Sequence, residues 1–283
     1  MSDVTVVIPT LGESPYLREA VESALGEQPA EVIVVVNGGA EVDVPGARVL
    51  RRDERGRSAA RNLGVEAART PFVAFLDDDD AALPGRLARQ RAALEAAWWA
   101  PLAFGRIRVV DGDGKPRDDW SRLLDRRFAR LAQTRAVSYE DVLAVQAPIY
   151  TSATMVRRDA FLAVGGFDPA FEAYEDLDLY LRLARSGDLL PVEGGPVTTY
   201  RLHGANTPSS RLYEGALRVA EKHLPLTSGR ARRLLLERRV DALWGLGRAA
   251  DARRAALSAL LEQPALLLHP RFARRLAAAT LRR

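Results

Sequence analysis

The chain of 283 residues contains no cysteine. Disulfides and thiolate metal sites are therefore excluded, and any bound metal has to use oxygen or imidazole ligands. Oxygen ligands favour hard ions such as Mg²⁺ and Mn²⁺. Apolar runs long enough to span a membrane are also absent, and no signal-like segment precedes the first predicted strand at Val4. With 47% hydrophobic and 28% charged residues, the composition predicts a globular, cytoplasmic protein.

Lysine is almost absent, since only Lys115 and Lys222 occur among 41 basic residues. The net charge of +4 is unevenly spread: residues 229–283 carry +9 and residues 1–228 carry −5. Because the excess of positive charge lies in this C-terminal region alone, we expect no nucleic-acid partner. A peripheral contact of the basic C-terminal helices with an anionic membrane face is one interpretation, and a solvated helical surface is the other.

Apolar, β-branched runs alternate with helical patterns through the first hundred residues. This alternation predicts an α/β fold with a mostly parallel sheet flanked by helices, in which ligands bind beyond the carboxyl ends of the strands. The predicted strands are residues 4–8, 31–36, 48–50 and 72–76, and the predicted helices are residues 15–25, 58–68 and 84–97.

The pattern changes after Pro101. We expect a strand over residues 102–110, a weakly patterned and mobile or acceptor-facing stretch over residues 118–139, and strands at 151–156 and 197–202. A helix is predicted over residues 175–186. After Pro208 the sequence is helical throughout, and residues 242–261 indicate a helical hairpin.

Four consecutive aspartates, residues 77–80, follow the apolar run of residues 71–76. Like charges this close raise one another's pKa unless a cation neutralises them, and a divalent ion with oxygen ligands would do so while leaving positions for phosphate oxygens. The alternative is an acidic start for the next helix, where negative charge suits the helix dipole. The loops after Pro9, Asn37 and Leu76 are expected to meet at one crevice.

Seven short motifs follow one another along the chain: residues 4–10 (VTVVIPT), 31–36 (EVIVVV), 58–64 (SAARNLG), 75–80 (FLDDDD), 165–168 (GGFD), 175–178 (EDLD) and 200–203 (YRLH). Taken together and in this order, they closely resemble the family 2 glycosyltransferases of the GT-A fold. A single Asp-x-Asp triplet is weak evidence, but the combination is specific. The resemblance covers about residues 3–208 and implies a catalytic domain over 1–208 with a basic helical extension over 209–283.

The resemblance implies a metal-dependent, inverting transfer of a sugar from a nucleotide-activated donor to an acceptor hydroxyl. Asp77 and Asp79 match the residues that hold Mn²⁺ or Mg²⁺ on the donor diphosphate, and His203 stands where a third metal ligand is often found. Asp176 matches the catalytic base, which takes the proton of the attacking hydroxyl. The implied nucleotide-sugar contacts are Pro9, Thr10, Leu11, Asn37, Arg61, Asp78, placed near the ribose, and Glu175.

Two positions depart from the family pattern. Leu11-Gly12 stands where an aromatic residue and Asn usually follow the first Pro-Thr, so apolar packing on the base remains but ring stacking does not. Asn37 replaces the usual Asp; its amide can still accept the imino proton of the base and donate to a base oxygen. A UDP-sugar is the donor that the family favours, and these two changes leave the nucleotide open.

Other functions are compatible with parts of the pattern. A non-catalytic scaffold that docks a partner through its C-terminal helices is the main alternative, since Leu11 and Asn37 depart from the family. A sugar nucleotidyltransferase would need a glycine-rich loop after the first strand, and residues 10–14 do not form one. The acceptor, which could belong to a surface polysaccharide, a glycolipid or a glycosylated metabolite, and the oligomeric state stay open.

Overall fold

The structure, a computed structural model, describes residues 3–132, 135–145, 149–202, 209–268 and 272. Two compact units make up the chain. We call Met1–Pro169 with Asp178–Asn206 the sheet unit, and Ala170–Leu177 with Thr207–Arg283 the helical unit. The short segment Ala170–Leu177 therefore packs with the C-terminal helices. The division into a catalytic domain over 1–208 and a helical extension over 209–283 stays a prediction.

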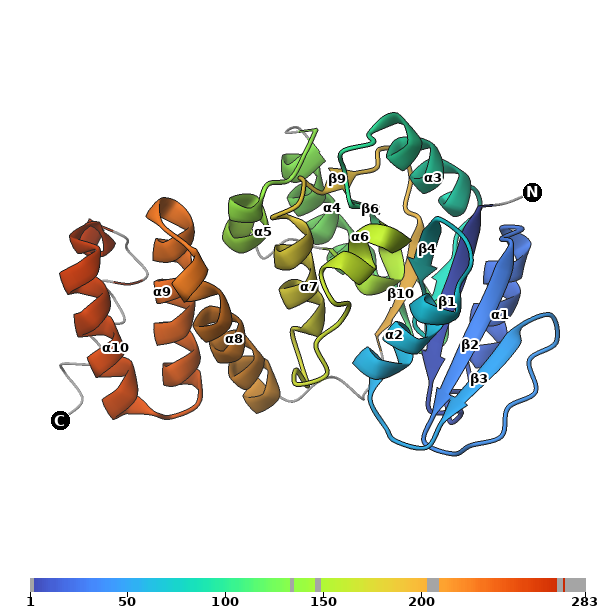
Figure 1. Cartoon of the computed structure of the whole chain (residues 1–283), viewed down its shortest axis with the longest axis horizontal. Coiled ribbons are helices and arrows are strands. Elements are labelled where there is room, and N and C mark those ends of the chain that lie inside the picture. Colours follow the sequence, from blue (N-terminus) through green and yellow to red (C-terminus); the bar gives the residue numbers. More distant parts are fainter. Residues whose placement is uncertain (1–2, 133–134, 146–148, 203–208, 269–271, 273–283) are drawn as a thin grey trace. The chain divides into compact units, whose positions relative to one another are not determined.

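The sheet unit contains a sheet with strand order β3-β2-β1-β4-β8-β6-β9 and a second sheet with order β5-β10-β7 (Figure 1). Strands β3, β2, β1 and β4 run parallel to one another, and β8 is antiparallel to both β4 and β6. The strands are β1 Val4–Thr10, β2 Glu31–Asn37, β3 Arg48–Arg52, β4 Phe72–Phe75, β5 Ala81–Ala82, β6 Leu102–Phe104, β7 Ile107–Asp111, β8 Thr154–Arg157, β9 Leu190–Pro191 and β10 Thr198–Leu202.

Helices cover both faces of the larger sheet. Alternate residues of β1, such as Val6 and Ile8, join the apolar core formed with α1 and α3, because neighbouring strand residues point to opposite faces. Val7 points the other way and lies against Gly64 of α2, where a Cβ atom would come within 2.4 Å of its side chain. The helices of this unit are α1 Leu17–Gly26, α2 Arg57–Ala67, α3 Arg86–Ala96, α4 Asp118–Ala132, α5 Tyr139–Val145, α6 Arg158–Ala163 and most of α7 Glu175–Leu183, with the 3-10 turn η1 Thr151–Ala153.

The strand predicted over residues 102–110 is wrong as a single element, because it forms β6 and β7 in two different sheets. Gly105 lies at the break, and a Cβ atom there would come within 2.6 Å of the Val197 side chain. The stretch over residues 118–139 was expected to be weakly patterned. This is also wrong for its first part, because residues Asp118–Ala132 form the amphipathic helix α4. Leu124, Phe128 and Leu131 are buried on one face of α4 at helical spacing.

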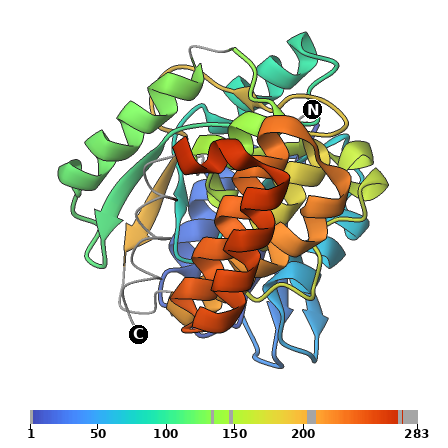
Figure 2. The ribbon, with the colours of Figure 1, turned by 90° about the vertical axis from the view of Figure 1, so that its left-hand side faces the viewer.

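Besides the segment Ala170–Leu177, the described part of the helical unit contains α8 Ser209–His223, η2 Leu224–Leu226, α9 Gly229–Gly245, α10 Ala249–Glu262 and η3 Pro264–Leu268. Figures 1 and 2 both show α9 and α10 side by side. The predicted hairpin is confirmed: Gly247, with φ at +72°, provides the left-handed residue of the turn between the two helices. Within the described ranges, no helix has the length and apolar content that crossing a bilayer requires.

Candidate functional site

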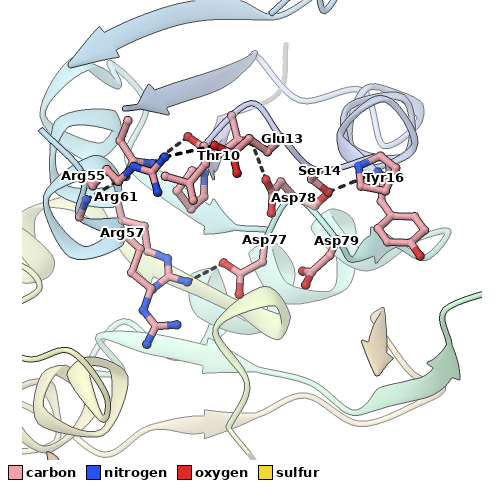
Figure 3. A pocket seen from close by; sticks show the side chains of 15 residues that line it. Thr10, Glu13, Ser14, Tyr16, Arg55, Arg57, Arg61, Asp77, Asp78 and Asp79 are labelled. Atoms are coloured by element: carbon pink, nitrogen blue, oxygen red, sulfur yellow. Dashed lines mark hydrogen bonds and ion pairs between the residues drawn. The ribbon is translucent and has the colours of Figure 1, made fainter. Parts of the chain in front are cut away.

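A cavity of about 740 Å³ lies beyond the carboxyl ends of β1, β2 and β4 (Figure 3). The three loops predicted to converge all contribute to it, because parallel strands present the same ends to one edge of a sheet. The start of α2 provides a fourth wall. The lining residues are Pro9, Thr10, Leu11, Glu13, Ser14, Pro15, Tyr16, Asn37, Arg55, Gly56, Arg57, Arg61, Asp77, Asp78 and Asp79.

The acidic loop presents its side chains in two directions. Figure 3 shows the carboxylates of Asp77 and Asp79 on one side of the loop and that of Asp78 on the other, beside Thr10. The Thr10 hydroxyl donates to Oδ2 of Asp78 at 2.5 Å, and the Ser14 hydroxyl donates to the Asp78 backbone carbonyl at 2.9 Å. The loop after β1 therefore holds Asp78, while Asp77 and Asp79 lie along the cavity.

Negative charge accumulates in this loop. Burial raises the pKa of Asp78 to about 6; the hydrogen bond from Thr10 opposes the shift, and the charges of Asp77 and Asp79 add to it. Burial also raises the pKa of Asp80, with further contributions from Asp79 and Asp77. A bound cation would relieve this repulsion.

Arg61 supplies part of the compensating charge. Its guanidinium is buried, and Nη2 lies 2.5 Å from Oδ1 of Asp77, whose side chain is 32% exposed. Arg61 also lies over the ring of Phe167, with Cζ 5.2 Å from the ring centroid. The family resemblance implies that Arg61 contacts the nucleotide sugar. The structure buries Arg61, pairs it with the acidic loop and places it in the lining of the cavity, and its contact with a nucleotide sugar stays a prediction.

Asn37 joins two walls of the cavity. Its Nδ2 donates to the Thr10 carbonyl at 2.8 Å, and its Oδ1 accepts the Gly56 backbone N–H at 2.9 Å. Only 3% of the residue is exposed. Each of its polar atoms therefore has a protein partner already, and contact with a base would use the second hydrogen or the second lone pair of the amide. Its predicted role in base recognition stays a prediction.

Arg201, near the end of β10, holds the acidic loop through hydrogen bonds and was not singled out from the sequence. Its Nε donates to the Asp79 carbonyl at 3.0 Å, and its backbone N–H donates to Oδ1 of Asp80 at 2.9 Å. Its guanidinium lies 4.1 Å from the ring centroid of Tyr16, which lines the cavity. Its position two residues before His203, in the last motif of the series, was the available signal.

The carboxylates of Asp77 and Asp79 fit a hard divalent cation, since they are oxygen donors on one side of a loop with excess negative charge. Among the described residues, no group of three or more acidic or histidine side chains is arranged to hold a metal. Two protein carboxylates are nevertheless a usual set for Mg²⁺, which takes its other ligands from phosphate and water. His203, the predicted third ligand, lies outside the described residues.

The remaining predicted residues belong to the helical unit. Glu175 and Asp176 are in the segment Ala170–Leu177 and are not among the residues that line the cavity. Glu175 is buried, and the backbone N–H of Leu177 donates to Oδ1 of Asp176 at 2.7 Å. The roles predicted for Asp176 and Glu175 stay predictions.

Comparison with known proteins identifies the family. Residues 5–161 match the model of glycosyl transferase family 2. The pre-mycofactocin glycosyltransferase of Mycobacterium tuberculosis is 34% identical over 205 residues, covering 68% of this chain and 41% of the relative. The succinoglycan biosynthesis protein ExoO of Rhizobium meliloti is 34% identical over 142 residues, covering 46% of this chain and 40% of the relative. The chain thus spans about two fifths of the length of these relatives.

Solved structures share the fold. TarS residues 1–349 of S. aureus in complex with UDP-GlcNAc superposes with a TM-score of 0.63 at 15% identity, covering 96% of this chain and 87% of that one. The mannosyltransferase PcManGT of Pyrobaculum calidifontis, in complex with GDP-Man and Mn²⁺, gives a TM-score of 0.62 at 16% identity, covering 98% and 84%. The chain therefore belongs to glycosyl transferase family 2 and has the GT-A fold.

Proposed function

We propose that this chain transfers a sugar, with inversion, from a nucleoside diphosphate sugar to an acceptor hydroxyl. The observation that carries the proposal is the cavity at the carboxyl edge of the sheet, which is lined by Thr10, Asn37, Arg61 and the acidic loop. TarS and PcManGT, which share the fold, have been solved with UDP-GlcNAc and with GDP-Man. Their ligands support a nucleotide-sugar donor here.

In the proposed reaction the acceptor oxygen forms a bond to the anomeric carbon while the bond from that carbon to the diphosphate oxygen breaks. Asp176 takes the hydroxyl proton as the new bond forms, and a nucleoside diphosphate leaves. Asp77 and Asp79 would hold Mn²⁺ or Mg²⁺, which neutralises the charge developing on the diphosphate. Arg61 orients the Asp77 carboxylate and adds a permanent positive charge to the same wall of the cavity.

The donor site is tested by thermal stabilisation with UDP, GDP, dTDP, CDP and ADP, each with and without Mn²⁺. A ligand at 100 times its Kd stabilises the folded chain by about 2.7 kcal/mol. We expect a shift with one nucleotide, UDP or GDP first, only when Mn²⁺ is present, and we expect Asp79→Asn to abolish it. Asp43→Asn, at an exposed position outside the cavity, is the control. No shift with any nucleotide would favour the scaffold alternative.

The role of Asp176 is tested by turnover of the donor that the stabilisation assay identifies. Asp176→Asn removes the base and retains the shape, so turnover should fall by about 10²- to 10⁴-fold while the nucleotide affinity stays within about twofold. Glu172→Gln is the matched control, because Glu172 is an exposed acid in the same segment and pairs with Arg211 at 3.4 Å. Equal turnover in Asp176→Asn and Glu172→Gln would reject Asp176 as the base.

The two relatives differ in what they are named for, pre-mycofactocin in one case and succinoglycan in the other. Both kinds of product fit the proposed reaction, and the acceptor is to be found by assay.

The net charge of +9 over residues 229–283 supports a peripheral contact with an anionic membrane face. Co-sedimentation of the full chain with phosphatidylglycerol vesicles at low salt, reversed by high salt, would support that contact.

A further inference from the structure

The segment that carries Asp176 packs with the C-terminal helices. Residues Ala170–Leu177 form one compact unit with α8, α9 and α10, although more than thirty residues separate this segment from the start of α8. Phe171 and Ala173 are buried, and Glu172 between them is exposed. The C-terminal region is therefore bound to the part of the chain on which the proposed base lies.

Gly215 of α8 lies directly against this segment. A Cβ atom at this position would lie 2.4 Å from the Ala173 carbonyl oxygen and 3.0 Å from Cδ2 of Tyr174. Glycine in a helix interior is unfavourable relative to alanine, so its presence there indicates a packing reason. Only the absence of a side chain allows the backbone of the segment to lie directly on α8.

Tyr174 is held in an unusual conformation by a second contact. Its φ angle is +63°, in the left-handed region that residues other than glycine seldom adopt, and such a conformation persists only when surrounding contacts hold it. The guanidinium of Arg238 from α9 lies over the Tyr174 ring, with Cζ 5.9 Å from the centroid. Burial lowers the pKa of Arg238, and the charges of Tyr174 and Asp241 with a Tyr174 hydrogen bond oppose this shift.

Phe171 anchors the other end of the segment. Two cations of α8 lie over its ring: Cζ of Arg218 is 5.7 Å from the ring centroid, and Nζ of Lys222 is 5.2 Å from it. Cation–ring contacts of this kind are favourable, more so where they are shielded from water. Both ends of the run from Phe171 to Tyr174 are therefore fixed by α8 and α9, two residues before Asp176.

We propose that α8 and α9 are a positioning element for Asp176, acting through Gly215 and Arg238 on the backbone of Ala173 and Tyr174. This inference rests on the proposed role of Asp176 as the base. Because the direction of the Asp176 side chain follows from the backbone that precedes it, a displaced Tyr174 moves the carboxylate away from the acceptor hydroxyl. Gly215 and Arg238 touch no reacting atom, so they are positioning residues.

The test compares two glycine-to-alanine variants of the full chain. Gly215→Ala places a methyl group against the Ala173 carbonyl. Gly26→Ala, in α1 of the sheet unit, meets nothing within 4 Å. Arg238→Met is a second variant that removes the cation from Tyr174 and does not depend on Gly215→Ala being folded.

Two readouts are measured with Mn²⁺ present. The first is hydrolysis of UDP-GlcNAc and of GDP-mannose, where we expect Gly215→Ala and Arg238→Met to lower kcat by about 10- to 100-fold with KM within twofold. Gly26→Ala should keep kcat per folded molecule. The second is amide hydrogen exchange of residues 170–177, which should become faster in Gly215→Ala and Arg238→Met and stay unchanged in Gly26→Ala.

The outcomes separate the inference from the proposed function. If Asp176→Asn retains full turnover, Asp176 is not the base and the proposed function fails on that point. If Asp176→Asn is inactive while Gly215→Ala and Arg238→Met keep the wild-type kcat, the positioning role is overturned. A loss in Gly26→Ala equal to that in Gly215→Ala would mean that the effect is not specific to the contact with Ala173 and would also overturn it. If neither donor is hydrolysed, unchanged exchange over residues 170–177 overturns the inference, and faster exchange supports it.

Discussion

The side chain of Asn37 connects two segments of the cavity wall through hydrogen bonds. The amide donates to the Thr10 carbonyl and accepts from Gly56, and so it links the end of β1 to the start of α2. A carboxylate at this position could accept from Gly56 but could not donate to Thr10, and two oxygens would face each other. The replacement of the usual Asp by Asn therefore has a local structural consequence, separate from any contact with a base.

Asn37→Asp is expected to lower the free energy of unfolding by about 1–3 kcal/mol at pH 8, because one buried hydrogen bond is replaced by repulsion between oxygens. Urea denaturation measures the change. The control is Gln28→Glu, the same change from amide to acid at an exposed position. Equal stability of the Asn37→Asp and Gln28→Glu variants would contradict the bridging role.

For single residues, the sequence predicted which residues line the cavity, but not which side chains they pair with. Pro9, Thr10, Leu11, Asn37, Arg61 and the three aspartates 77–79 were all named from the sequence, and all line one cavity. The pairing of Arg61 with Asp77, and the use of both amide atoms of Asn37 within the chain, could not be predicted. Each joins residues 16 to 27 positions apart, and their geometry is set by how α2 packs on β1.

The element that most directly stabilises the acidic loop is β10. Its Arg201 contacts the Asp79 carbonyl, the ring of Tyr16 and Oε2 of Glu19, the last at 2.8 Å. The Arg201 side chain is only 4% exposed, whereas Glu19 is 55% exposed. The ion pair itself is therefore a small part of its effect, and the hydrogen bond to the loop backbone is the larger part.

Arg201→Gln should lower the Mn²⁺-dependent affinity for the nucleotide diphosphate by about 3- to 30-fold, because a wrongly placed Asp79 binds metal and phosphate less well. We expect an accompanying loss of stability of about 2–4 kcal/mol from the buried polar groups left without a partner. Calorimetric titration measures the first effect and urea denaturation the second. Arg108→Gln, at an exposed position of the neighbouring strand β7, is the control. Unchanged affinity in Arg201→Gln would mean that β10 does not order the loop.

Strands and helices were predicted well where the spacing of apolar residues along the sequence was regular. The buried strands β1, β2 and β4 and the helices between them lie close to the expected ranges. The strand over residues 102–110 was predicted as one because its apolar run is continuous, yet the chain changes sheets at Gly105, where Val197 leaves no room for a side chain. Helix α4 was missed because its arginines weaken the apparent pattern, although its buried face is regular.

On the scale of the whole molecule, the two units divide the proposed chemistry. The cavity with the acidic loop belongs to the sheet unit, and Asp176 belongs to the helical unit. Deleting residues 249–283 removes α10, which buries Ala252, Ala256 and Ala259, and keeps Gly215 and Arg238. Deleting residues 229–283 removes Arg238 as well.

The shorter deletion is expected to lower the Tm by several degrees, since each kcal/mol corresponds to about 2–4 °C at this size, and to leave kcat for donor hydrolysis within about threefold. The longer deletion should lower kcat at least tenfold with KM little changed. Hydrolysis is normalised to the folded fraction measured by circular dichroism. Equal losses of kcat in the two deletions would contradict the division of roles between α9 and α10.

The sequence by itself determined the α/β class, the family and the residues at the strand ends, because these depend on local hydrophobic period and on motifs that lie within a few residues of one another. Only the tertiary structure decided which side chains pair inside the cavity and that Ala170–Leu177 joins the C-terminal helices. That contact depends on Gly215 and Arg238, which lie more than forty residues beyond Ala173 and Tyr174 and carry no local pattern of their own. Contacts at such separation follow from how whole elements pack, and no short stretch of sequence encodes them.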